Sequence, residues 1–337
     1  MLYCISILKF CRINRCWPYY DSRFYSERRK NEKIIKELYT DSTRYILFNR
    51  LHPIVTRSDI NKKKFDLINI SNKQFKEISS LEGIKIFLGI DAPQFGISLS
   101  NIGKEELLVM LRNKFNINGL YLSNLSDYFN LSQSDIWSRL RGLYAWHYSN
   151  LFCGICGSET YSSESGYKRI CKNSNCHSKK DSIKTLWTNY PRIDPVVTIL
   201  PVTEKDPENG LPACLLARKE IFPPKLMSCI TGFLDPGESA EVAAVRELKE
   251  ELNLDCNNLI YQLSQYWPLQ SSLFLGYTAE VPLRTHFLLD EELSFAHWFN
   301  VDKVKLLLEN KHLEYFIPPQ STIMFRLIKN WYIKTIN

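Results

Sequence analysis

Three glutamates, Glu247, Glu250 and Glu251, lie within two turns of a segment with helical hydrophobic spacing. Carboxylates this close repel one another, each like-charge pair by roughly 0.2–0.5 kcal/mol. Such a cluster attracts a hard divalent cation, and oxygen ligands suit Mg²⁺ or Mn²⁺. The alternative is a solvated acidic face, which is the usual place for glutamates on an amphipathic helix. The segments around the three acids must therefore decide between a metal site and an ordinary surface.

The helix that would position these acids is expected over residues 239–252. Ser239 is a favourable N-cap residue, and it follows a loop that contains glycine and proline. The apolar residues of the segment form one arc on a helical wheel, roughly opposite the glutamates: Val242, Val245, Leu248 and Leu252. Asn253 accepts the left-handed conformation that is common just after helices, so we expect the helix to end there.

Four cysteines have the spacing of metal ligands: Cys153, Cys156, Cys171 and Cys176. They form two loop-like turns separated by 14 residues, and a glycine beside the first turn helps the backbone to curl. Two such turns predict a tetrahedral Zn²⁺ site with Zn–S bonds of about 2.3 Å. Four thiolates leave no open position on the metal, so this zinc would stabilise the fold rather than take part in catalysis. The alternative is four free buried cysteines.

The composition is that of a globular protein, with 45% hydrophobic and 23% charged residues. No run of 18 apolar residues occurs, so we expect no membrane-spanning helix. The other cysteines are scattered singly or lie near the N-terminus, which favours a reducing compartment over a disulfide framework.

The net charge of +7 is concentrated near the N-terminus. Residues 1–30 contain seven basic and two acidic side chains, which leaves the rest of the chain almost neutral and does not indicate a nucleic-acid-binding surface. A basic, acid-poor segment with scattered apolar residues is typical of a mitochondrial presequence. We expect one over residues 1–25, with cleavage between Tyr25 and Ser26. The alternatives are a disordered basic tail or a wrongly assigned first exon, and a cytoplasmic or peroxisomal location.

The hydrophobic patterns predict three folded regions. Residues 26–150 are expected to form an α+β domain, with strands over 44–48, 85–90 and 95–99 and helices over 104–114 and 132–147. Residues 151–185 form the predicted zinc ribbon. Residues 186–337 are expected to form the domain that carries the acids, with strands over 196–202 and 214–218.

The predicted helix and the loop before it resemble the Nudix box. The segment reads Gly232, five residues, Glu238, seven residues, Arg246-Glu247-Leu248, one residue and Glu250-Glu251. Asn253 stands where this motif usually has glycine. The resemblance implies a Nudix α/β/α sandwich and Mg²⁺- or Mn²⁺-dependent hydrolysis of a pyrophosphate bond.

Further segments are similar to the NADH pyrophosphatase branch of this family: residues 152–157, 166–171, 190–195 and 318–319. The wide second cysteine loop is similar to that of the eukaryotic members of the branch. An element over residues 264–272 matches only in part, because Tyr266, Leu269 and Gln270 replace the residues typical of the branch. The branch implies hydrolysis of NADH or NAD⁺ to a nicotinamide mononucleotide and AMP, by a homodimer with a Nudix-like N-terminal α+β domain. The alternatives are ADP-ribose or NAD-capped RNA as the substrate, or a non-catalytic binding module.

The resemblance also implies roles for individual residues. The metal ligands would be the Thr231 carbonyl and three carboxylates: Glu247, Glu251 and Glu292. These acids would be catalytic together with Glu250, a further ligand or base, while Arg246 and Glu238 would support them structurally. The dinucleotide would contact residues of several segments: Tyr190, Thr231, Gly232, Phe233, Gln265, Trp267 and Ser272.

Overall fold

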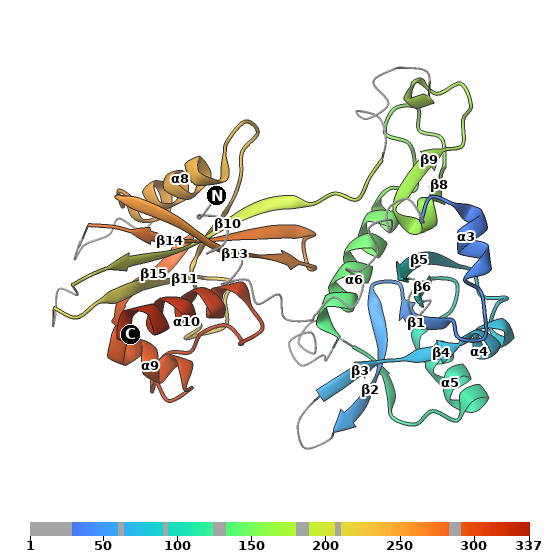
Figure 1. Ribbon diagram of the computed structural model, residues 1–337, viewed down its shortest axis with the longest axis horizontal. Coiled ribbons are helices and arrows are strands. Elements are labelled where there is room, and N and C mark those ends of the chain that lie inside the picture. Colours follow the sequence, from blue (N-terminus) through green and yellow to red (C-terminus); the bar gives the residue numbers. More distant parts are fainter. Residues whose placement is uncertain are drawn as a thin grey trace, which may run out of the picture. The chain divides into compact units, whose positions relative to one another are not determined.

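The computed structural model describes residues 29–59, 64–89, 94–123, 133–179, 189–205, 210–282 and 291–337. The chain divides into two compact units, with the boundary between Arg192 and Ile193. Each unit combines a sheet with helices (Figure 1). The predicted presequence over residues 1–25 and its cleavage position lie outside the described residues. Within the described part of the chain, no helix combines the length and the hydropathy needed to cross a membrane.

The second unit is built on a six-stranded mixed sheet. The strand order is β13 (Asn258–Trp267), β14 (Ser272–Glu280), β10 (Asp194–Thr203), β11 (Ala213–Lys219) and β15 (Leu293–Asn300), with β12 (Ile230–Phe233) beside β10. β10 and β14 are parallel, whereas the other neighbours are antiparallel. The strands predicted over 196–202 and 214–218 are confirmed as β10 and β11.

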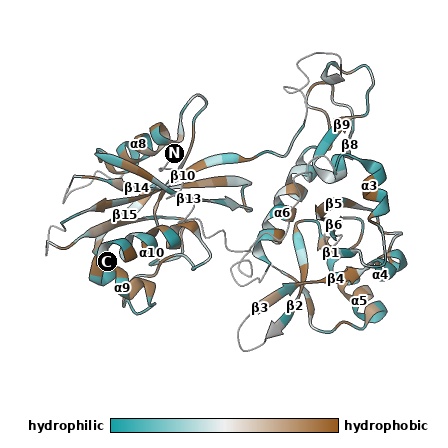
Figure 2. Ribbon diagram, viewed as in Figure 1, coloured by the Kyte–Doolittle hydropathy of each residue, from teal (hydrophilic) through white to brown (hydrophobic). Residues whose placement is uncertain are grey.

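Adjacent residues of β10 enter two different cores, because side chains of a strand alternate between the faces of its sheet. Val196 packs in a cluster with helices α9 (Val301–Leu308) and α10 (Ile323–Ile336). Val197 packs in a second cluster with helix α8 (Ala240–Leu252). Polar and apolar residues are interspersed along these helices (Figure 2), as expected for helices that cover one face of a sheet. The sheet therefore lies between α8 and the pair α9 and α10, in the predicted sandwich.

The buried face of α8 differs from the predicted one. Val242 and Val245 are 55% and 43% exposed, so only the two leucines of the predicted arc are buried. The face that contacts the sheet instead includes two small residues and two acids: Ala243, Ala244, Glu247 and Glu251. The predicted arc is wrong because the alanines, which let a helix approach a sheet closely, decide which side turns inward. Because α8 turns this face toward the sheet, the carboxylates of Glu247 and Glu251 also lie on the inner side of the helix.

Both ends of α8 lie where the sequence predicts them. The Ser239 hydroxyl accepts a hydrogen bond from the Val242 N–H at 3.3 Å. Asn253 has a φ of 52° and a ψ of 35°, in the left-handed region, and the Leu254 N–H donates to the Leu248 carbonyl at 3.1 Å. The Asn253 N–H donates to the Lys249 carbonyl at 2.9 Å, so both bonds close the last turn of the helix. Asn253 therefore makes the turn that glycine makes in the usual motif.

The first unit contains a seven-stranded sheet. Its path is β3 (Lys64–Leu67), β2 (His52–Asp59), β1 (Arg44–Asn49), β6 (Gln94–Leu99) and β5 (Gly83–Gly89), with β4 (Asn69–Ser71) beside β1 and β7 (Leu120–Leu122) beside β2. Its helices are α3 (Glu32–Glu37), α4 (Asn72–Glu77), α5 (Lys104–Phe115) and α6 (Ser134–Ser149). The strands and helices predicted for this region are confirmed within the described residues, with ends shifted by at most about two residues.

The predicted zinc ribbon contains an antiparallel hairpin, β8 (Thr160–Ser163) with β9 (Lys168–Cys171). A buried contact ties this hairpin to α6, because Arg169 Nη1 donates to His147 Nδ1 at 2.9 Å. Arginine has no acceptor, so Nδ1 of His147 must accept. The proton then lies on Nε2, which donates to the Gly166 carbonyl at 2.8 Å. His147 is therefore held in its neutral form.

Burial lowers the pKa of His147 to about 4, with Arg169 adding to the shift and the Gly166 carbonyl opposing it. The unfolded chain takes up this proton near pH 6.5 and the folded chain only near pH 4, so stability is full above 6.5 and falls as the pH drops between the two values. We expect a loss of about 2 kcal/mol in the free energy of unfolding by about pH 5.

Urea unfolding at about pH 7.5 and about pH 5 measures this loss. His147→Gln keeps a donor and an acceptor but takes up no proton, so this variant should lose that part of the pH dependence. If it keeps the full pH dependence of the unaltered chain, His147 is not the titrating group.

Candidate functional site

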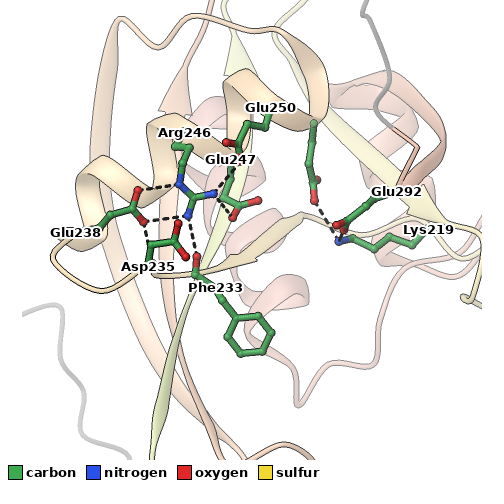
Figure 3. Close-up of polar contacts among 9 residues, drawn as sticks. Lys219, Phe233, Asp235, Glu238, Arg246, Glu247, Glu250 and Glu292 are labelled. Carbon is green, nitrogen blue, oxygen red and sulfur yellow. Dashed lines mark hydrogen bonds and ion pairs between the residues drawn. The ribbon is translucent and has the colours of Figure 1, made fainter.

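The Arg246 guanidinium lies at the centre of the acidic site (Figure 3). Its Nε donates to Glu238 Oε1 at 2.7 Å, and its Nη1 donates to Glu247 Oε1 and Glu250 Oε2, both at 2.8 Å. Its Nη2 donates to Glu238 Oε2 and to the Phe233 carbonyl, both at 2.9 Å. A planar guanidinium offers its five N–H groups in fixed directions. Arg246 therefore fixes two acids of α8 and the preceding loop in one arrangement.

Glu238 closes the loop between β12 and α8. Its Oε2 also accepts the Asp235 N–H at 2.9 Å, and Gly237 turns the chain with a φ of 96°, where a side chain would be strained. The hydrogen bonds from Arg246 lower the pKa of Glu238 to about 2. Glu238 therefore stays ionised at neutral pH and is a permanent counter-charge for the guanidinium.

Gly232 on β12 gives Glu247 the room to lie against the sheet. A Cβ atom on Gly232 would overlap the carboxyl group of Glu247. Gly232 pairs with Val197 of the central strand β10, so the carboxylate lies against the backbone of the sheet. Burial raises the pKa of Glu247, and the hydrogen bond from Arg246 opposes this shift.

A second cation, Lys219, lies at the end of β11. Its Nζ is 3.1 Å from Glu251 Oε1 and 2.6 Å from Glu292 Oε2, and Figure 3 shows it turned toward Glu292. The Glu251 side chain is only 3% exposed, and its Oε2 has no hydrogen-bond partner among the described residues. Burial raises the pKa of Glu251 to about 7, although Lys219 opposes the shift. Lys219 was not among the residues predicted from the sequence, because no local pattern marks a lysine at the end of a strand as part of a site.

The acids of the site are divided between two cations. Among the residues described, the acids of this site do not bring three carboxylate oxygens within 4.8 Å of one another. Arg246 holds two of the four acids and Lys219 the other two. The donor set consists of carboxylate oxygens, and the buried Oε2 of Glu251 is available to a ligand. These residues therefore fit a hard divalent cation such as Mg²⁺ or Mn²⁺.

Gln265, a predicted substrate contact, has a structural role. Its Nε2 donates to the Ser321 carbonyl at 2.9 Å, and its Oε1 accepts the Ile323 N–H at 2.6 Å. Both ends of the amide are thus engaged at the start of helix α10. Gln265 therefore anchors α10 to β13, and its contact with the substrate stays a prediction.

Trp267 and Ser272 are paired on the neighbouring strands β13 and β14. The Trp267 ring stacks on Phe274, with the ring centroids 5.5 Å apart and the planes at 8°, and it packs against the core below α9 and α10. Ser272 is fully buried, and its hydroxyl has no hydrogen-bond partner within the described part of the chain. Ser272 therefore lies in the interior of the second unit and Trp267 is partly buried against it, and their contacts with the substrate stay predictions.

The remaining predicted contacts lie in different places. Phe233 is 53% exposed, and its carbonyl is bound by Arg246 in the acidic site. Thr231 lies on the same strand, β12. Tyr190 belongs to the first unit, where it is 48% exposed and its ring centroid lies 5.5 Å from Lys168 Nζ. Phe233 and Thr231 thus lie on β12, the strand against which Glu247 lies.

The four predicted zinc ligands come together in the first unit. Their Sγ atoms all lie within 4.8 Å of one another: Cys153, Cys156, Cys171 and Cys176. The Sγ atoms of Cys153 and Cys176 are 3.8 Å apart, and those of Cys156 and Cys171 are 3.5 Å apart. A tetrahedral site with Zn–S bonds of about 2.3 Å requires sulfur atoms about 3.8 Å apart. The cluster therefore fits a structural zinc.

The sequence matches known proteins in the same regions. Residues 193–318 match the NUDIX domain family. The chain is 31% identical over 339 residues to the NAD-capped RNA hydrolase NUDT12 of Macaca fascicularis. This alignment covers 91% of this chain and 71% of that protein. The chain is 32% identical over 256 residues to the mitochondrial NAD(P)H pyrophosphatase NUDT13 of Homo sapiens, with 72% of this chain and 66% of that protein covered.

A bacterial relative, the NAD-capped RNA hydrolase NudC of Pseudomonas syringae, is 33% identical over 172 residues, with 51% of this chain and 55% of that protein covered. The chain belongs to the Nudix hydrolase family and, within it, to the branch of the NADH pyrophosphatases. The sequence predicted this family from the Nudix box and the four cysteines. In the structure, the residues of each motif lie close together.

Replacement of Gly232 by alanine tests the contact between β12 and Glu247. The new Cβ atom must push the carboxylate out of its position, so we expect hydrolase activity to fall about 100-fold, as for other misplacements of about 1 Å in an active site. Gly103→Ala is the control, because a Cβ atom there meets nothing closer than 3.8 Å. Steady-state rates and circular dichroism are the measurements. A folded Gly232→Ala chain with full activity would contradict the role of this contact.

Proposed function

We propose that the chain hydrolyses the pyrophosphate bond of NADH or NAD⁺, giving a nicotinamide mononucleotide and AMP. The observation that carries this proposal is Glu251 Oε2, which is buried, lacks a partner among the described residues and lies on the same inward face of α8 as Glu247. Such an oxygen is costly to bury unless a ligand satisfies it. The names of the relatives support this class of substrate. NUDT12 and NudC are named as NAD-capped RNA hydrolases, and NUDT13 is named as an NAD(P)H pyrophosphatase.

Glu247 and Glu251 would hold divalent cations, with the Thr231 carbonyl and Glu292 as further ligands. Mg²⁺ or Mn²⁺, when bound there, neutralises charge on the pyrophosphate and orients the attacking water. Oxygen donors suit both ions. Arg246, which binds Glu247 and Glu250, would keep these two acids oriented.

Glu250 and Phe233 would act on the water and on the substrate. The Glu250 side chain is 54% exposed, and Arg246 Nη1 binds its Oε2, so the carboxylate is both oriented and accessible to a water molecule. It would accept the proton of that water or add a metal ligand. The exposed Phe233 ring offers a face on which a planar base stacks, a contact that contributes about 1–3 kcal/mol in nucleic-acid complexes.

NAD-capped RNA is the second candidate substrate, and the names of NUDT12 and NudC favour it. The bond to be broken is the same pyrophosphate, so the acidic site would serve both substrates. ADP-ribose is a third candidate, since it contains the same linkage without the nicotinamide base. Rates on the three classes of substrate separate these possibilities.

Two further proposals concern the location and assembly of the chain. Mitochondrial import rests on the basic, acid-poor residues 1–30 and is supported by the relative NUDT13, which is named as mitochondrial. A homodimer rests on the resemblance to the NADH pyrophosphatase branch. Import into isolated mitochondria tests the first proposal, and light scattering from the purified chain tests the second.

Glu251→Gln removes one carboxylate charge and keeps the size of the side chain. We expect Mg²⁺- or Mn²⁺-dependent hydrolysis of NADH to fall at least about 100-fold, because the group that holds the cation beside the pyrophosphate is lost. AMP release measured by chromatography gives the rate, and circular dichroism reports the fold. Glu241→Gln is the matched control on the same helix, because Glu241 is exposed and its carboxylate accepts the Tyr277 hydroxyl at 3.2 Å, outside the acidic site.

The same assay is run on NAD⁺, ADP-ribose and NAD-capped RNA. Cleavage of NADH or NAD⁺ to a mononucleotide and AMP supports the proposed reaction. If the unaltered chain cleaves only ADP-ribose, the substrate is wrong. If Glu251→Gln and the unaltered chain act at equal rates, the proposed role of Glu251 is wrong.

The cysteine cluster should contain one zinc ion per chain. Elemental analysis of the purified protein is expected to find that ion, and Cys171→Ser should lose it and unfold the ribbon at a lower temperature, because three thiolates hold zinc less firmly than four. Cys256→Ser is the control, since Cys256 is a free cysteine outside the cluster. Retention of zinc and thermal stability in Cys171→Ser would show that the cluster is not the zinc site.

A further inference from the structure

Lys219 ends strand β11 at a register shift against β15. The irregularity lies between Arg218 and Lys219, where β11 meets the start of β15. From this position the ammonium group reaches both Glu251 on helix α8 and Glu292 just before β15, at 3.1 and 2.6 Å. Figure 3 shows this ion pair beside the Arg246 network. Lys219 thus links two acids that come from different elements.

The ammonium occupies one side of the most buried acid of the site. The Glu251 side chain is 3% exposed, the Lys219 side chain 21% and the Glu292 side chain 64%. An ionised carboxylate as buried as Glu251 needs a positive partner, and Lys219 is that partner. Only Oε1 is engaged by the lysine, and Oε2 has no hydrogen-bond partner among the described residues.

The two resident cations differ in how firmly they are held. Arg246 is fixed by a bidentate contact with Glu238 and by the Phe233 carbonyl, so it cannot leave without opening the loop before α8. Lys219 has a point charge on a flexible four-carbon stem, and it forms ion pairs with two acids of the site, Glu251 and Glu292. A cation that enters the site can therefore displace Lys219 and leave Arg246 in place.

We propose that Lys219 is an internal counter-cation that occupies Glu251 and Glu292 in the metal-free chain and competes with the divalent cation for them. This inference rests on the proposed function, because it assumes that the two acids bind that cation. The lysine keeps the buried carboxylate compensated when the metal is away. In return it weakens the binding of the metal, since an ammonium group and a divalent cation oppose each other at the same oxygens.

The test is the affinity of the full chain for Mn²⁺, measured by the electron paramagnetic resonance signal of the free ion. Lys219→Gln removes the competing charge, so its dissociation constant for Mn²⁺ should fall by about tenfold or more. Lys219→Met, which keeps an apolar stem of similar length, should show the same fall if the glutamine variant does not fold. Lys219→Arg keeps the charge and should remain close to the unaltered chain.

Lys249→Gln is the matched control. Lys249 lies on α8 and pairs with Asp255 at 2.7 Å, but that pair is exposed on both sides and is separate from the acidic site. Its loss should leave the dissociation constant for Mn²⁺ unchanged within about twofold. Equal or weaker binding of Mn²⁺ by folded Lys219→Gln or Lys219→Met would overturn the inference.

The outcome separates this inference from the proposed function. If the unaltered chain binds Mn²⁺ and hydrolyses NADH, but Lys219→Gln binds Mn²⁺ no more tightly, only the role of Lys219 is wrong. If the unaltered chain binds no Mn²⁺, the proposed metal-dependent reaction fails together with the role of Lys219.

Discussion

The second unit depends on one unfavourable placement, the burial of two carboxylates on the inner face of helix α8. Glu247 and Glu251 are 9% and 3% exposed, on the side of the helix that contacts the sheet. Burying an unpaired charge costs several kcal/mol, so each acid requires a cation. Arg246 compensates the first and Lys219 the second. Both acids can be ionised in the interior only because these two partners are present.

The surrounding fold accommodates this arrangement. Ala243 and Ala244 let α8 lie near the sheet, and Gly232 leaves the space that the Glu247 carboxylate fills. Ser239 and Asn253 cap the ends of the helix, so its acids are held at fixed positions along the strands. The alternation of β10 between two cores keeps the sheet covered on both faces while one edge of α8 remains charged. The small residues, the helix caps and the alternation of β10 thus all help to hold the two buried carboxylates of α8 in place.

The sequence predicted the parts of the site that are encoded locally. The spacing of the Nudix box and of the four cysteines gave the family and the two clusters, and Ser239 and Asn253 gave both ends of α8. Each of these signals lies within a short stretch of chain. Caps, turns and ligand spacing can be read in this way because their partners are neighbours in sequence.

The remainder depended on contacts between distant segments. The valines of α8 suggested a buried face that the alanines in fact provide, because hydrophobicity alone does not reveal how closely a helix approaches its sheet. Lys219 becomes part of the site only when the folded chain brings its side chain to Glu251 of α8, and nothing around it in the sequence signals this. Gln265 likewise acquires its hydrogen-bond partners at the start of α10, far along the chain.

The central claim is that the inward carboxylates of α8 gather divalent ions. Diffraction from crystals soaked in Mn²⁺, recorded at the manganese absorption edge, tests it most directly. We expect an anomalous peak from Mn²⁺ coordinated by Glu247 and Glu251. Strong peaks that involve neither side chain, with both carboxylates still bound only to Arg246 and Lys219, would contradict it.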